Sequence, residues 1–145
     1  MYYVEDENSA IDKEKLEKDI DALLSYLEET GDFSIHFISD DEMRVLNRDF
    51  REKDEPTDIL SFAINDGEAF PFEEGEEKDL GDIFISVESM RRNASSFGVS
   101  DGEELRRLLV HGLLHLRGMD HETNDFASEP MLIEQERIMH ALGWV

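Results

Sequence analysis

The sequence contains no cysteine, and this absence excludes two kinds of architecture. A disulfide framework, which holds many small secreted domains together, cannot form. A thiolate metal site cannot form either, so any metal ion bound by this chain must be held by nitrogen and oxygen atoms.

A long apolar segment is also missing. The N-terminal stretch from Met1 to Asn8 carries neither the basic residues nor the apolar run of a signal peptide, and no other segment approaches the length of a membrane span. From these absences we expect a cytoplasmic protein without a membrane partner.

Positive charge is scarce, because 14 lysines and arginines face 37 aspartates and glutamates, for a formal net charge of −23. A chain this acidic repels phosphate backbones, and nucleic-acid-binding proteins usually carry a basic footprint. Acidic residues crowd the stretch from Asp66 to Asp79, whose glycines and proline predict a loop. All the arginines lie between Arg44 and Arg137, where they either form a local basic patch or pair with neighbouring carboxylates.

The remaining composition is that of a globular chain: 145 residues, 39% of them hydrophobic, predict one domain over residues 1–145 with a real core. Helix-like and strand-like patterns mix without strict alternation, which predicts the α+β class, with a small mixed sheet packed against several helices. Five helices are expected: Ile11–Glu29, a helix capped by Ser39 that ends at about Phe50, Val87–Phe97, a helix capped by Ser100 that continues through His115, and a last helix capped by Ser128. Four strands are expected: Tyr2–Val4, Phe33–Ile38, Thr57–Ala63 and Leu80–Val87.

Three of the five histidines fall between His111 and His121. His111 and His115 are four residues apart in a predicted helix, so both imidazoles lie on one face, one turn apart. Gly118 can adopt the left-handed conformation that ends a helix, after which the chain can turn back and bring His121 to the same point. Three convergent imidazoles predict a transition-metal site, with zinc as the first choice. A fourth position left open for water or substrate is typical of a catalytic site.

The spacing matches HExxHxxGxxH, the signature of one class of zinc peptidases, except at one position. The peptidases carry their general base, a glutamate, where this chain has Gly112. The metal-binding half of the motif is therefore present, and the peptidase half is missing.

Three blocks of the sequence together resemble the YbeY family of bacterial rRNA maturation endoribonucleases. They are NRDFREKDEPTDILSF (Asn47–Phe62), LGDIFIS (Leu80–Ser86) and HGLLHLRGMDH (His111–His121), in the family's order and spacing. The whole chain fits the family's size, and the resemblance implies an α+β fold, one bound metal ion, usually taken as zinc, and cleavage of single-stranded RNA. It also implies 3′-end maturation of small-subunit ribosomal RNA and ribosome quality control, with ribosomal RNA and the ribosomal particle as partners.

The resemblance also assigns residues. The family's metal ligands fall on His111, His115 and His121, which would hold one Zn²⁺ or another divalent transition metal per chain, and its functional arginine falls on Arg51. A guanidinium is a planar fork that matches phosphate oxygens, so Arg51 is expected to stabilise charge on the phosphate. Asp120 either orients a ligand or simply belongs to the turn. The residues that are candidates for supporting a ligand or contacting the substrate are Thr57, Asp58, Ser61, Asp82 and Asp120.

Two other functions fit part of the pattern. Another metallohydrolase, peptidase-like or acting on a small phosphoester, would need a carboxylate from elsewhere to replace the missing glutamate. A ribosome-associated factor with a structural metal would have a closed fourth coordination position. The net charge of −23 further predicts weak, salt-sensitive binding of free RNA, and hence a protein partner that helps to dock the enzyme.

Overall fold

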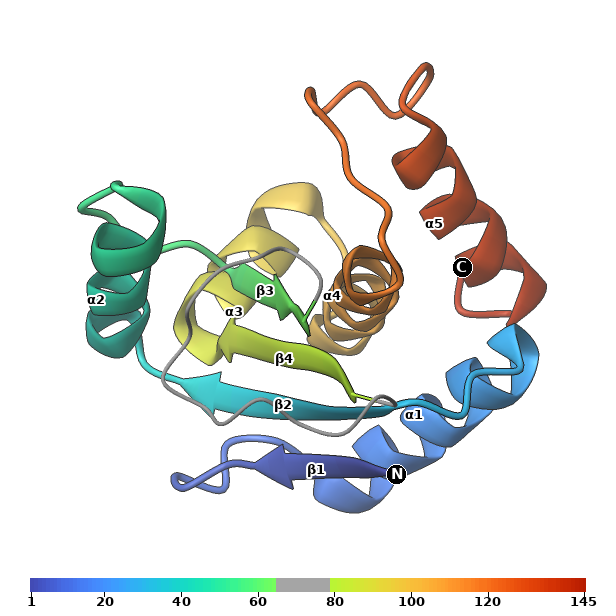
Figure 1. Cartoon of the computed structure of the whole chain (residues 1–145), viewed down its shortest axis with the longest axis horizontal. Helices are drawn as coiled ribbons and strands as arrows, with labels where there is room; N and C mark the ends of the chain where they lie inside the picture. The colour runs from blue at the N-terminus through green and yellow to red at the C-terminus, as the bar shows by residue number, and fades with distance from the viewer. Residues whose placement is uncertain (65–78) are drawn as a thin grey trace.

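The structure is a computed structural model that describes residues 1–64 and 79–145. Within those ranges it contains five helices and four strands, which confirms the predicted α+β class (Figure 1). The predicted acidic loop lies outside the described residues, apart from Asp79, which begins a strand. The elements follow in the order β1 (Tyr2–Glu5), α1 (Lys13–Leu27), β2 (Asp32–Ile38), α2 (Asp40–Arg51), β3 (Ile59–Ala63), β4 (Asp79–Ser86), α3 (Val87–Phe97), α4 (Asp101–Leu116) and α5 (Pro130–Ala141).

The strands form one mixed sheet in the order β1-β2-β4-β3. β1 is parallel to β2 and β2 is parallel to β4, whereas β3 is antiparallel to β4 at the sheet edge. Parallel neighbours need a crossover connection, which α1 supplies between β1 and β2. The start of β3 lies beside the end of β4, where Ile59 pairs with Ile85.

Both faces of the sheet are covered, as the alternation of side chains along β4 shows. Ile83 and Ile85 point into the main core, where residues of α1, α3, α4 and α5 meet. Phe84 points the other way and belongs to a smaller cluster with Phe62 and with Met43 of α2. In Figure 1, α2 accordingly lies apart from α4 and α5. Among the described residues, no helix has both the length and the apolar character needed to cross a membrane.

Two of the three predicted serine caps are present, and the third prediction is wrong. Ser39 and Ser100 each accept a hydrogen bond from the backbone N–H three residues later, at 3.2 and 3.0 Å. The hydroxyl of Ser128 donates instead to Asp125 at 2.7 Å, and α5 begins at Pro130 without a side-chain cap. Proline has no N–H to satisfy at the first helical position, so this helix can start without a capping hydroxyl.

Candidate metal centre

The turn after α4 brings three histidines together. His111 and His115 lie one turn apart on α4, which ends at Leu116. Gly118 follows with a φ of +99°, and the chain folds back so that the ring of His121 lies 5.1 Å from that of His111 and 5.8 Å from that of His115. One potential ligand atom from each histidine lies within 4.8 Å of the other two. The structure thus places the three imidazoles as the spacing predicted.

His111 is held by a chain of polar contacts that reaches α5. Its Nδ1 lies 2.7 Å from Oε1 of Gln135. The amide of Gln135 is oriented in turn, because its Nε2 donates to Glu136 at 3.0 Å, and Glu136 accepts hydrogen bonds from Arg107 at 2.9 and 3.1 Å. Since an amide oxygen can only accept, Nδ1 of His111 carries the proton and the lone pair is on Nε2.

His121 is oriented by the turn that carries it. Its Nδ1 lies 2.7 Å from the carbonyl oxygen of Thr123, so Nδ1 is protonated and the lone pair is again on Nε2. Asp120 accepts a hydrogen bond from the backbone N–H of His121 at 2.8 Å, and its carboxylate also lies 4.0 Å from Nε2 of His115. Asp120 therefore combines a turn contact with a position beside the histidines.

The charge state of His111 suits a metal ligand. Burial is the main cause that lowers its pKa to about 4, and the hydrogen bond with Gln135 opposes this shift. His111 is therefore neutral at pH 7, which is the form that binds a metal ion. Three imidazoles, two of them with fixed tautomers, are a donor set that fits a transition-metal ion such as Zn²⁺.

The histidines line an open hollow of about 880 Å³ and an adjoining hollow of about 530 Å³. The larger hollow contains all three histidines, and the smaller one is lined by His111 and His115 together with Ser61 and Asp120. Space of this size beside three potential ligands would let a substrate approach a metal ion held there, as a catalytic site requires.

Arg51 enters both hollows from the end of α2. Its Nη1 donates to the carbonyl oxygen of Phe50 at 3.2 Å, and its Nη2 donates to the carbonyl oxygen of Ser61 at 3.1 Å. Its Cζ also lies 4.7 Å from the centre of the Phe62 ring. These contacts hold the guanidinium beside β3, within the same hollows as His111.

Close packing explains why the peptidase glutamate is absent. At Gly112, α4 approaches the sheet so closely that an added Cβ would lie 2.9 Å from Cδ1 of Ile83 and 3.1 Å from Cδ1 of Ile59. A glutamate at this position would have to displace core side chains and bury its own charge. A glutamate at position 112 would therefore require Ile83 and Ile59 to shift before it could act as the peptidase general base.

The other predicted residues lie in two different places. Thr57 and Asp58 line the larger hollow, and Ser61 lines the smaller one. Asp58 accepts a hydrogen bond from Asn93 at 3.0 Å, and burial raises its pKa. Asp82 lines neither hollow in the described part of the chain; it accepts a hydrogen bond from a serine of β2 on the opposite face of the sheet.

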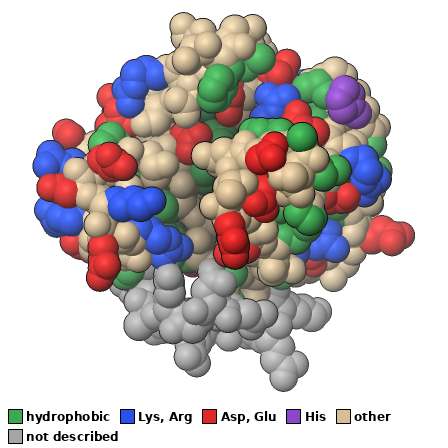
Figure 2. Space-filling model, turned by 90° about the horizontal axis from the view of Figure 1, so that it is seen from above, with side chains coloured by type: hydrophobic (Ala, Val, Ile, Leu, Met, Phe, Trp, Pro, Cys, Tyr) green, Lys and Arg blue, Asp and Glu red, His purple; other side chains and the backbone are tan. Residues whose placement is uncertain are grey.

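The sequence left open whether the arginines form a basic patch or pair with carboxylates. In the structure most of them pair with carboxylates. Arg44 lies 2.7 Å from Asp54, and Arg48 lies 3.0 Å from Asp49. Figure 2 shows the result on the side of α2, where Lys and Arg side chains lie among Asp and Glu side chains. The other arginines with carboxylate partners are Arg91, Arg92, Arg106, Arg107, Arg117 and Arg137.

Sequence reasoning missed the residues that support the site from α3 and α5. Gln135 lies at helical spacing between Met131 and Ile138. A polar residue on this apolar face was the only sequence feature that could have indicated its role. The structure shows that Gln135 is 2% exposed and bonded to His111. Asn93 carried no signal at all, because its contact with Asp58 depends on how α3 packs.

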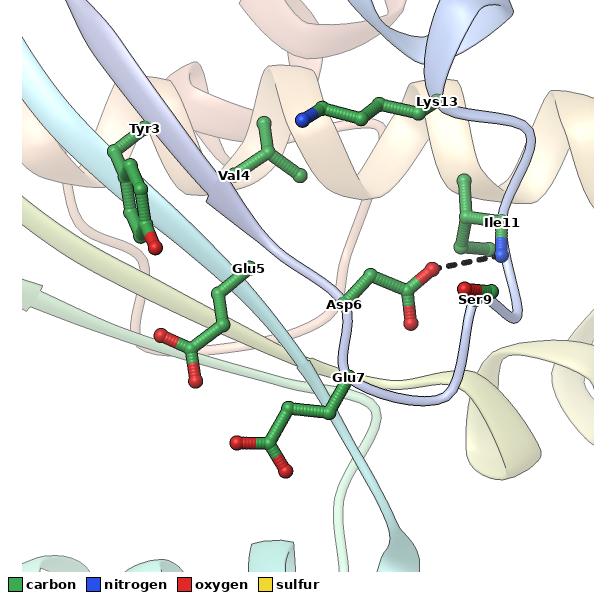
Figure 3. Close-up of a pocket in the computed structure, with 8 residues that line it drawn as sticks. All are labelled: Tyr3, Val4, Glu5, Asp6, Glu7, Ser9, Ile11 and Lys13. Atoms are coloured by element: carbon green, nitrogen blue, oxygen red, sulfur yellow. Dashed lines mark hydrogen bonds between the residues drawn. The ribbon is translucent and has the colours of Figure 1, made fainter.

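A separate cavity, of about 330 Å³, lies on β1 and the segment before α1 (Figure 3). Asp6 accepts a hydrogen bond from the backbone N–H of Ile11 at 2.9 Å, and Tyr3 and Lys13 line the same cavity. No histidine contributes to this lining. Among the described residues, the nitrogen ligands that suit a transition metal therefore converge at the histidine hollow and not here.

Comparison with known proteins gives consistent results. A family model described as endoribonuclease YbeY matches residues 2–143. Proteins named endoribonuclease YbeY are similar to this chain: that of Chloroflexus aurantiacus is 40% identical over 141 residues (95% of this chain, 92% of the relative). That of Halalkalibacterium halodurans is 43% identical over 120 residues (80% and 75%). A solution structure of a Thermotoga maritima protein matches with a TM-score of 0.64 and 27% identity, covering 98% of this chain and 89% of that one.

Proposed function

The chain belongs to the endoribonuclease YbeY family, and on that basis we propose that it is a metal-dependent endoribonuclease that cleaves single-stranded RNA. The observation that supports this most is the convergence of His111, His115 and His121 beside Arg51 in one open hollow. The metal we propose is one Zn²⁺ per chain, because three imidazoles with an open side suit catalytic zinc. The substrate we propose is ribosomal RNA, at the 3′ end of the small-subunit molecule, with a role in ribosome quality control.

The protein's contribution to the metal site is preorganisation. When bound, the ion would polarise a phosphodiester and lower the pKa of a water molecule. Gln135 and the carbonyl oxygen of Thr123 hold His111 and His121 with their Nε2 lone pairs available. Burial keeps His111 unprotonated at neutral pH, so no proton has to leave it before the ion binds.

Arg51 is proposed to bind the scissile phosphate. Its guanidinium can donate two parallel hydrogen bonds to phosphate oxygens, and its charge opposes the negative charge that develops in the transition state. The contacts with the carbonyl oxygen of Ser61 and with the Phe62 ring fix its position near the histidines. A fixed cation is more effective than a mobile one, because it needs no reorganisation during the reaction.

Metal analysis combined with a cleavage assay tests the central proposal. The purified protein should contain about one transition-metal ion per chain, chelation should abolish cleavage of single-stranded RNA, and added Zn²⁺ should restore it. Circular dichroism should keep most of the helical signal after chelation, because the main core consists of apolar side chains and includes none of the three histidines. Undiminished cleavage after complete metal removal would contradict the proposal, and unfolding on chelation would indicate a structural metal.

Arg51→Ala should lower kcat by about 100-fold and leave the metal content unchanged, because the guanidinium is assigned to the phosphate and not to the ion. Arg51→Lys should recover only part of the loss, since an ammonium lacks the planar fork. Arg48→Ala is the matched control on the same helix: Arg48 pairs with Asp49, and its loss should leave cleavage near the parent rate. Parental cleavage by Arg51→Ala would show that the assignment is wrong.

The acidic surface favours ribosomal particles over naked RNA as the site of action. The chain carries a formal charge of −23, and arginines such as Arg44 and Arg48 are occupied by carboxylates. Free RNA should therefore bind weakly and with strong salt dependence, and a protein partner is proposed to help docking. Cleavage of one sequence, free and within a ribosomal particle, should be compared at matched salt. Equal cleavage with tight binding of the free strand would contradict the docking proposal.

A further inference from the structure

Phe97 is an exposed aromatic residue in the wall of the larger hollow. It is the last residue of α3, and 66% of its surface is accessible to solvent. Phenylalanine is usually buried, and an exposed apolar surface rimmed by polar groups is typical of a binding site. Because the ring lines a hollow that is open to solvent, a flat ligand can stack on it.

Glu104 presents a second unexplained group to the same hollow. Only 3% of its surface is exposed, and its Oε2 has no hydrogen-bond partner among the described residues. Burial is the main cause that raises its pKa, and the nearby carboxylate of Asp58 adds to the shift. A buried carboxyl group without a protein donor is costly, so a group that entered the hollow and donated to this carboxyl would remove that cost.

Asp58 is linked to α3, which carries Phe97, by a hydrogen bond, and to Glu104 by its charge. Its Oδ2 accepts a hydrogen bond from Asn93 at 3.0 Å, and Asn93 lies one helical turn before Phe97 on the same face of α3. The charge of Asp58 also acts on Glu104. Glu104 in turn precedes His111 by about two turns of α4, or roughly 10 Å along the helix axis. The ring and the two carboxyl groups line the same hollow as the three histidines.

We propose that Phe97, Asp58 and Glu104 form a subsite for one unpaired nucleobase of the RNA strand, an inference that rests on the RNA cleavage proposed above. The base stacks on the Phe97 ring, and an N–H group on its edge donates to the carboxyl group of Glu104, which lines the same hollow. A base inside a duplex has its faces stacked and its edge paired, so it cannot enter such a subsite. These residues would thus select single-stranded over double-stranded RNA.

The charge balance of the hollow is compatible with an RNA strand. The described lining contains as many cationic as acidic side chains, whereas the whole chain has 14 of the former and 37 of the latter. Burial raises the pKa of two of the acidic groups, Asp58 and Glu104. The hollow is therefore locally much less repulsive to phosphate than the rest of the surface. Its cationic residues are Arg51, Lys53 and Arg107, and its acidic residues are Glu55, Asp58 and Glu104.

Stacking can be measured with a single-stranded oligoribonucleotide that contains 2-aminopurine, whose fluorescence falls when the base stacks. The metal-loaded parent enzyme should quench this signal in the first phase of a stopped-flow trace, before cleavage. Phe97→Ala should remove the quench and raise KM by about 10-fold, with kcat changed by less than about twofold, because a base subsite contributes to binding. Phe97→Trp should restore both the quench and the parental KM.

Two further variants make the test specific. Glu104→Leu removes the acceptor and should raise KM by about fivefold without lowering Tm, because the Oε2 atom has no protein donor to lose. Tyr3→Ala is the matched control: this ring is 62% exposed and lies at the separate cavity of Figure 3, so its loss should leave KM and quench as in the parent.

The outcomes separate this inference from the proposed function. If the parent cleaves RNA and Phe97→Ala retains the parental KM and quench, the subsite is wrong and the nuclease assignment stands. A lower kcat with unchanged KM would also overturn the subsite. If the metal-loaded parent neither cleaves RNA nor quenches the probe, the proposed function fails and the subsite fails with it.

Discussion

The histidine hollow and the cluster around His36 use the same side chain in opposite ways, on opposite faces of the sheet. His36 is 9% exposed, and its ring stacks on Phe84 with centres 4.6 Å apart. Its Nε2 lies 2.9 Å from the hydroxyl of Ser34, which donates to Asp82, and its Nδ1 lies 3.6 Å from Glu5. Both ring nitrogens of His36 therefore face polar partners within the sheet.

In the hollow, His111 and His121 each make a polar contact through Nδ1, with Gln135 and with the carbonyl oxygen of Thr123. Nδ1 of His111 and Nδ1 of His121 are engaged by oxygen acceptors, and one potential ligand atom from each of the three histidines lies within 4.8 Å of the others. The comparison teaches that a histidine is suited to bind a metal ion when its surroundings engage one ring nitrogen and leave the other available beside similar donors. Partners on both nitrogens make the same residue a structural one.

The largest difference between the two regions is expected when each histidine is removed. His111→Ala should lose most of its metal and reduce metal affinity by more than about 100-fold, since it removes a ligand and not merely a ligand's support. His36→Ala should keep the parental metal content and lose about 1–3 kcal/mol of stability, because it removes a buried ring and leaves polar partners unpaired. Metal analysis and thermal unfolding of both proteins measure this. Equal metal content in the two variants would show that His111 is no more important for metal binding than His36.

A smaller difference is expected when the partners of the histidines are changed. Gln135→Leu should weaken metal binding by about 10- to 100-fold, because His111 loses the acceptor that fixes its tautomer. Ser34→Ala, which removes the hydroxyl beside His36, should leave metal affinity unchanged. Competition with a chelator of known affinity gives both values. A parental affinity in Gln135→Leu would mean that the hydrogen bond does not prepare the site.

The smallest effect is expected at two carboxyl groups, the partly buried Asp82 and the buried Glu104. Asp82→Ala should cost about 1–2 kcal/mol, because it breaks the hydrogen bond with Ser34. Glu104→Gln should instead stabilise the protein by about 1 kcal/mol at pH 7, since the buried Oε2 has no partner.

The pH dependence of the Glu104→Gln gain has a definite sign. Burial raises the pKa of Glu104 in the folded state above its usual value of 4.5. The parent protein therefore loses stability as the pH rises above 4.5, whereas the glutamine variant does not. The stability difference between the two proteins should shrink toward about pH 4. Urea unfolding at several pH values measures this, and a gain that does not vary with pH would contradict it.

The sequence alone was sufficient where short-range patterns decide the structure. The helix Val87–Phe97 was predicted with the bounds that the structure shows, and the cap at Ser100 is present. Helical periodicity and capping depend on residues three or four positions apart, which a sequence displays directly. Ser128 failed as a cap because the same hydroxyl had a competing local acceptor, Asp125, which the pattern did not reveal.

The sequence by itself therefore determined the α+β class, the helix with His111 and His115 on one face, and the turn at Gly118 that returns His121 to them. Only the tertiary structure decided that Gln135 supports His111 and that Asp82 lies apart from the site. It also decided that Phe97 and Glu104 share one hollow with the histidines. The physical reason is range: local conformation follows from neighbours along the chain, whereas these contacts depend on which faces of α3, α4, α5 and the sheet are buried against one another.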